Sequence, residues 1–207
     1  MTPKFFEERR PHNGIDYPDF MESTKQSIGI AKPDELNERE LNIFNYRKLN
    51  FQRSNRIHKT FKIEDEHAEI IKSIDQPQLW MVITEDWCGD SAQNLPYLYL
   101  LSELSEFVTL KIIPRDDNLD IMDLYLTNGK SRSIPKLVVF DEAGNELFTW
   151  GPRPQELVNL IEQWKSEGKD KTEWTTAVHT WYAKNKGQQL IEEITKLVSQ
   201  TTVNSIY

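Results

Sequence analysis

The sequence has a single cysteine, Cys88, among its 207 residues, so no disulfide can form within the chain. It also lacks long hydrophobic runs: the longest, residues 79–83 and 137–140, are far shorter than the roughly 18 residues a membrane span requires. Residues 1–11 carry mixed charge and no apolar stretch, so a secretory signal is not expected. These features predict a soluble, cytoplasmic protein with no membrane partner.

An excess of positive charge is also missing, since 25 Lys and Arg residues stand against 33 Asp and Glu residues, for a net charge of -8. That balance argues against a dedicated nucleic-acid binder, which needs cations facing phosphates. Residues 46–62 are a local exception, with six cations and no acid. They either pair with the acidic body or face solvent, or they bring Arg53 or Arg56 to the edge of Cys88 to hold an anionic group.

The sequence offers no metal site. Its four histidines show no ligand spacing. Asp116, Asn118 and Asp120 imitate the start of a calcium loop, but the sixth position is Ile121 instead of Gly and the twelfth is Thr127 instead of Glu. We therefore expect helix capping at this place, and neither a metal nor an organic cofactor.

Residues 1–63 are predicted to be an arm followed by a helical extension. The first 33 residues are interrupted by proline and glycine and predict an irregular arm. Asp34 is a candidate N-cap, and the stretch to Lys59, free of Pro and Gly, predicts a helix. Its apolar spacing is loose, which allows a break near Ser54.

Residues 64–168 alternate between amphipathic helices and short apolar strands. The predicted elements are a helix at 65–74, a strand at 79–84, a helix at 91–106, a strand at 108–113, a short helix near 119–126, a strand pair at 135–140 and 146–150, and a helix at 154–164. This order predicts an α/β fold with a mixed sheet and helices on both faces. Residues 169–207 carry two helical stripes interrupted at Gly187, which we expect to pack on the body.

The segment that carries chemistry is Trp87-Cys88-Gly89-Asp90-Ser91, where a buried strand leads into an amphipathic helix. A thiol at a helix N-terminus faces unpaired backbone N–H groups and the positive end of the helix dipole, which favour the nucleophilic thiolate. Arg132 is a further cation expected to favour it. Glu85, Asp86 and Asp90 oppose it through like charge.

This segment, together with Ser133-Ile134-Pro135 before one strand and Gly151 after the next, resembles the thioredoxin-like superfamily, as in a bacterial thioredoxin family protein. The resemblance covers about residues 65–168. It implies that Pro135 is cis beside Cys88 and that the backbone of Ile134 binds an incoming polypeptide or thiol. The substrate-binding residues implied in this way are Trp87, Gly89, Asp90, Ser133, Ile134, Pro135, Trp150 and Gly151.

Two positions depart from the family pattern. Ser91 stands where the second, resolving cysteine of Cys-x-x-Cys would be, and Val82 stands where the family has a buried acid. A self-contained dithiol reductase is therefore excluded. The sequence predicts a monothiol oxidoreductase in which Cys88 attacks a disulfide, Ser91 hydrogen-bonds its thiolate and an external thiol completes the exchange.

The expected partners are client proteins or mixed disulfides of small thiols, as for monothiol glutaredoxins or bacilliredoxins. The alternative is a non-catalytic thioredoxin-like module that binds a peptide or protein, with Cys88 as a small buried residue. The oligomeric state is not predicted.

Overall fold

The computed structural model describes residues 2–204, and side chains over residues 2–201. Within this part of the chain, the sheet has four strands in the order β2-β1-β3-β4. The strands are β1 (Gln78–Thr84), β2 (Val108–Pro114), β3 (Lys136–Asp141) and β4 (Glu146–Trp150). β1 runs parallel to β2 and antiparallel to β3, and β3 and β4 form an antiparallel hairpin. The mixed sheet predicted from the alternation of elements is confirmed.

The larger hydrophobic core lies on the face of the sheet formed by the even-numbered residues of β1. Trp80 and Val82 are fully buried there, in one cluster with Leu98 and Leu101 of the helix after β1. Helices from distant parts of the chain complete this core. They are α2 (Tyr17–Ile30), α3 (Glu38–Thr60), α4 (Asp65–Lys72), α5 (Gly89–Ser102) and α9 (Gln188–Asn204).

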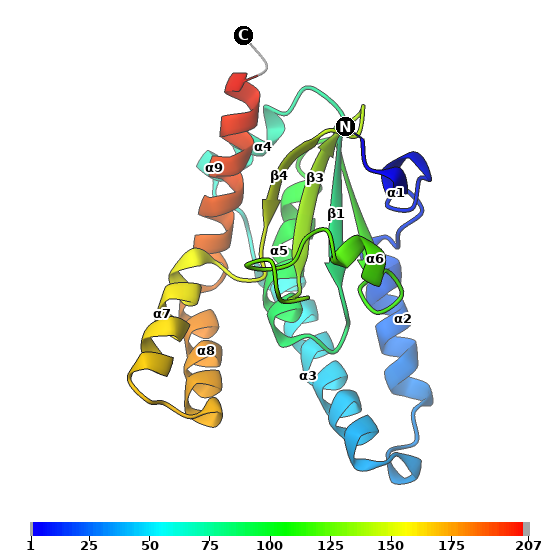
Figure 1. Cartoon of the computed structure of the whole chain (residues 1–207), viewed down its shortest axis with the longest axis vertical. Coiled ribbons are helices and arrows are strands. Elements are labelled where there is room, and N and C mark those ends of the chain that lie inside the picture. The colour runs from blue at the N-terminus through cyan, green and yellow to red at the C-terminus, as the bar shows by residue number, and fades with distance from the viewer. Residues whose placement is uncertain (1, 205–207) are drawn as a thin grey trace.

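The opposite face of the sheet is covered by two short helices, α1 (Lys4–Glu7) and α6 (Leu119–Met122). Phe5 and Phe6 of α1 both contact Phe140 of β3, with ring centroids 6.1 Å and 5.0 Å away. Figure 1 shows the two layers of helices with the sheet between them. Helices on both faces were predicted, and the α/β thioredoxin-like fold is confirmed.

The expectation of an irregular arm over residues 1–33 is wrong. This segment holds α1 and the 14-residue α2, and Ile15 bridges to Ile112 on the edge of β2. Pro18 was one sign of irregular structure, but it lies in the first turn of α2. Proline fits there without loss, since the first N–H groups of a helix have no partner inside the helix.

The long helix α3 begins later than expected and does not break. Its N-cap is Asn37, which forms a capping box with Glu40, while Asp34 belongs to the 3-10 turn η1 (Pro33–Glu35). Ser54 is buried in the middle of α3, and its hydroxyl donates to the carbonyl of Ala92 in α5 at 3.3 Å. Ser54 therefore makes a contact between two helices where a break was considered.

The C-terminal third is helical and is interrupted near Gly187, as predicted. Helices α7 (Gln155–Ser166) and α8 (Lys171–Asn185) pack on each other around a small separate cluster that includes Leu157 and Tyr182. They stand beside the sheet in Figure 1, whereas α9 runs along it and joins the larger core. Over residues 2–204, none of the helices combines the length and the apolar character needed to cross a membrane.

Candidate functional site

Cys88 lies at the N-cap position of α5, where the chain leaves β1 and enters the helix. Its thiol donates to the backbone carbonyl of Ile134, with Sγ 3.3 Å from the oxygen. The Ile134–Pro135 peptide bond is cis. The two motifs that carried the family resemblance therefore meet in space although 46 residues separate them, as predicted.

The environment of Cys88 favours the neutral thiol in the resting protein. The side chain is only 9% exposed, and this burial raises the pKa of the Cys88 thiol, with a further rise from the negative charge of Asp90. Hydrogen bonds from the Ser91 hydroxyl and from the backbone N–H groups of Asp90 and Ser91 act in the opposite direction. The helix terminus lowers the pKa as expected, but burial outweighs it.

Ser91 lies one turn into α5, directly behind the thiol. It is 3% exposed, and its hydroxyl accepts a hydrogen bond from the hydroxyl of Thr84 at the end of β1. Val82, at the position of the family's buried acid, is fully enclosed in apolar side chains. Ser91, with a hydrogen-bonded hydroxyl, therefore replaces the resolving cysteine of a dithiol enzyme. Val82, with an apolar side chain, replaces its buried acid.

Asp90 is held by a guanidinium and a phenol from the C-terminal third of the chain. Arg153 binds both carboxylate oxygens, with Nε 3.0 Å from Oδ1 and Nη2 2.5 Å from Oδ2. The hydroxyl of Tyr182 donates to Oδ1 at 2.9 Å. Burial lowers the pKa of Arg153, but the charge of Asp90 and its hydrogen bond, with smaller contributions from Tyr182 and Cys88, raise it above its ordinary value. Because the Cys88 charge favours the charged guanidinium, the guanidinium in turn favours the Cys88 thiolate.

Sequence reasoning missed this arrangement. Arg153 and Tyr182 lie 63 and 92 residues from Asp90, and no local pattern joins them. The only available signal was the position of Arg153, two residues after the family's Gly151. Asn94, which donates to Tyr182 at 3.1 Å and to the Pro152 carbonyl at 3.3 Å, fixes the phenol from the other side.

The other two acids near the thiol in sequence, Asp86 and Glu85, have partners of their own. Arg47 of α3 binds Asp86, with Nε 2.6 Å from Oδ2. Glu85 accepts the backbone N–H of Asp116 at 2.8 Å, and burial raises the pKa of its carboxyl. Of the three acids expected to oppose the thiolate, Asp90 is the one whose charge is among the main causes of the raised pKa of Cys88.

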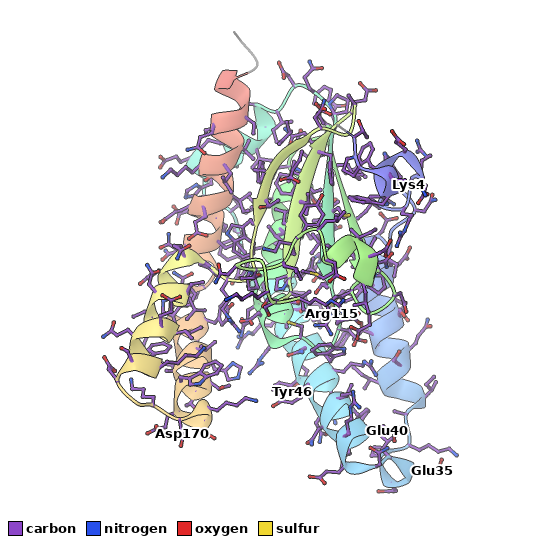
Figure 2. All side chains as sticks on the ribbon, viewed as in Figure 1. Lys4, Glu35, Glu40, Tyr46, Arg115 and Asp170 are labelled. Atoms are coloured by element: carbon purple, nitrogen blue, oxygen red, sulfur yellow. The ribbon has the colours of Figure 1, made fainter. Side chains whose placement is uncertain are left out.

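Arg132, which was expected to favour the thiolate, is engaged with Asp123 through two contacts of 2.6 Å and 2.7 Å. A different cation, Arg115, lies over the tryptophan of the motif, at one end of the sheet in Figure 2. Its guanidinium carbon stands 5.0 Å from the centre of the Trp87 ring. Trp87 is half-buried, and the Arg115 guanidinium covers one face of its indole ring, next to the cysteine segment.

Gly151 reaches the site from the hairpin and fits there because it has no side chain. Its φ is +107°, and a Cβ placed on it would lie 2.4 Å from the Pro135 carbonyl oxygen. Trp150 lies deeper than the rim where we expected it: it is 6% exposed, and its indole N–H donates to Glu193 of α9 at 2.6 Å. Gly151, which directly follows β4, is therefore the residue that lies against Pro135.

The remaining expected site residues lie at the edges. Gly89 is the first residue of α5 and faces open space, with nothing within 4 Å of a Cβ placed on it. Ser133 is half-buried, and its hydroxyl is 2.7 Å from that of Ser131. Over the side chains of residues 2–201 there is no group of three or more His, Cys, Asp or Glu residues that could hold a metal ion.

A family model described as thioredoxin matches residues 38–165, which is more than half of the chain. The fold and the cysteine at the start of α5 define a thioredoxin-fold protein. The chain belongs to the thioredoxin family.

Two solved structures are similar to it over nearly their whole length. Protein PA1234 from Pseudomonas aeruginosa, described as a protein of unknown function, is 19% identical, with a TM-score of 0.58 over 92% of this chain and 95% of that one. An HIV epitope-scaffold is 18% identical, with a TM-score of 0.56 over 91% of this chain and 94% of that one. No curated protein matches significantly. At these identities the likeness shows the fold alone.

Proposed function

We propose that this protein is a monothiol thiol–disulfide oxidoreductase in which Cys88 is the nucleophile. The observation that carries the proposal is the placement of the one cysteine at the first turn of α5, with Sγ 3.3 Å from the carbonyl before the cis-proline. Helix N-termini are one of the places where the pKa of a cysteine is lowered, because the unpaired N–H groups there favour the nucleophilic thiolate. Ser91 in the second position restricts the chemistry to one thiol.

The exchange takes two steps that balance. The Cys88 thiol loses its proton to solvent, and the thiolate attacks one sulfur of a mixed disulfide, forming a new S–S bond and releasing the other sulfur as a thiolate. An external thiolate then attacks the Cys88 mixed disulfide, breaks that bond and restores the Cys88 thiolate. The oxidant is the incoming disulfide and the reductant is the external thiol, so no further electron carrier is required.

The groups around Cys88 stabilise its thiolate or bind the incoming ligand. The Ser91 hydroxyl and the first N–H groups of α5 stabilise the negative charge on sulfur. Arg153 keeps the charge of Asp90 from acting in full against the thiolate. The Ile134 carbonyl, which accepts the thiol proton in the resting protein, is the backbone acceptor we assign to an extended polypeptide or thiol ligand.

The test uses the full chain and glutathione disulfide. Native protein should gain one glutathione moiety by intact mass, and an added thiol should remove it, whereas Cys88→Ser should gain none. Ser91→Cys should gain dithiol turnover in insulin reduction with dithiothreitol, because it restores a resolving thiol. If folded native protein gains no more glutathione than Cys88→Ser across a pH range that reaches above the thiol pKa, the proposal is wrong.

A second candidate is a non-catalytic module that binds a peptide or protein partner. The observation in its favour is the small exposure of Cys88, 9%, together with a thiol pKa raised by burial. The mixed-disulfide experiment separates the two candidates, since a binding module leaves the glutathione disulfide intact.

A further inference from the structure

Arg115 lies where the ends of two parallel strands meet the cysteine segment. It is the first residue after β2, and its backbone N–H donates at 3.0 Å to the carbonyl of Thr84, the last residue of β1. Figure 2 shows Arg115 at this end of the sheet. Its backbone is therefore fixed to the strand that leads into Cys88, and its side chain starts from a position that the sheet determines.

The guanidinium of Arg115 contacts both of the segments that form the candidate site. Its carbon stands 5.0 Å from the centre of the Trp87 ring, in the residue directly before Cys88. Its Nη1 atom donates to the backbone carbonyl of Arg132 at 3.3 Å, two residues before Ile134. The cysteine segment and the loop before the cis-proline are far apart in the chain, and this one side chain touches each of them.

A carboxylate fixes the orientation of the guanidinium. Oδ1 of Asp116 accepts from Nε of Arg115 at 2.9 Å and from Nη2 at 2.7 Å. Asp116 is held in turn, because its backbone N–H donates to Glu85 at 2.8 Å. A planar guanidinium that is bound through Nε and Nη2 can still use Nη1 for another partner and place its flat face on an indole. The three contacts of Arg115 thus use three different parts of one rigid group.

The ion pair itself explains little of this arrangement. The side chain of Arg115 is 20% exposed and that of Asp116 is 56% exposed, so the pair is close to a surface ion pair and stabilises the fold only weakly. What the contacts do determine is the placement of Trp87 relative to the loop that ends at Ile134. The carbonyl of Ile134 is the backbone acceptor that the proposed function assigns to the incoming ligand.

We propose that Arg115 is a positioning residue that holds Trp87 and residues 132–134 in place for an extended polypeptide substrate. The inference deepens the proposed function and rests on it, and it names polypeptide disulfides as the substrate class that benefits. A polypeptide that pairs its backbone with this loop depends on the placement of the loop beside Trp87. A small disulfide needs little more than the sulfur of Cys88.

The experiment compares two disulfides that release the same coloured thiol, thionitrobenzoate. One joins it to the central cysteine of a capped pentapeptide that is otherwise alanine, and the other joins it to mercaptoethanol. In both, the Cys88 thiolate attacks the aliphatic sulfur and forms a new S–S bond, and thionitrobenzoate leaves as a thiolate with the electron pair of the broken bond. Because both reactions need the same thiolate, the ratio of the peptide rate to the small-disulfide rate is independent of the pKa of Cys88.

In Arg115→Gln this ratio should fall about tenfold, within the roughly hundredfold that a misplacement of about 1 Å can cost. Arg115→Lys should lower the ratio in the same way, since an ammonium keeps the charge but cannot make the three contacts at once. The matched control is Arg132→Gln, which removes a cation from the same loop and keeps the backbone carbonyl that Arg115 binds. Its ratio should equal that of the native protein.

A purely structural role gives a different result from a positioning role. Equal loss of both rates in Arg115→Gln would overturn the positioning role, because general destabilisation does not distinguish the two disulfides. A native ratio in Arg115→Lys would overturn it as well, because charge alone would then be sufficient. If Arg115→Gln does not fold, the ratio measured for Arg115→Lys decides the question.

Failure of the oxidoreductase is visible separately. Native protein that releases no more thionitrobenzoate from either disulfide than Cys88→Ser does would refute the proposed function, and the role of Arg115 with it. Release from both disulfides at a ratio that neither Arg115 variant changes would refute the role of Arg115 alone.

Discussion

Replacing Arg153 by glutamine should weaken the fold and raise the pKa of Cys88 at once. The guanidinium makes two contacts with Asp90, and a hydrogen bond to a charged group contributes about 1.5–3 kcal/mol. The side chains of Asp90 and Arg153 are 13% and 28% exposed, which places the pair between a buried and a surface ion pair. We therefore expect the free energy of unfolding to fall by about 2–3 kcal/mol.

For a chain of this length, one kcal/mol shifts the unfolding temperature by about 2–4 °C, so Arg153→Gln should unfold about 4–12 °C lower. Two changes should both raise the pKa of Cys88. The cation that favours the thiolate is lost, and the negative charge of Asp90 is no longer paired with a guanidinium. Because a higher pKa reduces the thiolate fraction at neutral pH, alkylation of Cys88 at neutral pH should be slower in Arg153→Gln than in the native protein.

The assay is the pH dependence of Cys88 alkylation by iodoacetamide, a neutral reagent. In the native protein the midpoint should lie above the ordinary thiol range, because burial and Asp90 raise the pKa of the Cys88 thiol. Below the midpoint, the rate should rise about tenfold per pH unit, since it follows the thiolate fraction. Arg153→Gln should move the midpoint to higher pH.

Two variants make the test discriminating. Asp90→Asn should destabilise the protein as Arg153→Gln does, but it should move the midpoint to lower pH because it removes the negative charge beside the thiolate. Arg132→Gln breaks an ion pair in which both side chains are 46% exposed, so it should change stability by less than about 1 kcal/mol and leave the midpoint in place. Coincident profiles for native protein, Arg153→Gln and Asp90→Asn would refute this account of the site.

Three further changes test the fold. Gly151→Ala should lower the unfolding temperature, because φ is +107° and the new Cβ would meet the Pro135 carbonyl, whereas Gly89→Ala, in open space, should not; thermal melts that agree for both would contradict this. Ile194→Ala removes a fully buried side chain of α9 and should cost about 2–5 kcal/mol in urea unfolding; a loss well below that would mean that α9 is not part of the core. Asn37→Ala removes the capping box of α3 and should cost about 0.5–2 kcal/mol by the same measurement, and no loss would refute the cap.

Local apolar patterning was sufficient to predict the sheet and its two-sided cover. In β1 every residue from Leu79 to Thr84 is buried, so a short apolar run with turn signals at both ends identified the central strand. The same kind of local signal failed where proline begins a helix, as Pro18 does in α2, because the sequence does not say whether a proline ends one element or starts the next. Asp34 and Asn37 are both good N-caps, and the reciprocal bond with Glu40 favours the second.

The backbone part of the site could be predicted, and its electrostatics could not. The meeting of Cys88 and Ile134 follows from a motif pair that the family shares. The partners of Asp90 and Arg132 follow from the packing of helices and loops that carry no such motif. The sequence left the net direction of the thiol pKa open, because the helix terminus and the neighbouring charges were visible in it and the burial of the sulfur was not.

Helices α3 and α8, which flank the sheet in the chain order, take part in the site. Asp86 and Asp90 lie beside Cys88 in sequence, and each is bound by a group from a helix distant in the chain: Arg47 of α3 binds Asp86, and Tyr182 of α8 binds Asp90. Without them, two carboxylates would stand near the thiol with fewer partners, and the thiolate would be less favoured still. These two helices therefore help to set the charge around the thiol. Arg47→Gln or Tyr182→Phe should move the alkylation midpoint to higher pH, because each change leaves a carboxylate near the thiol with one partner fewer.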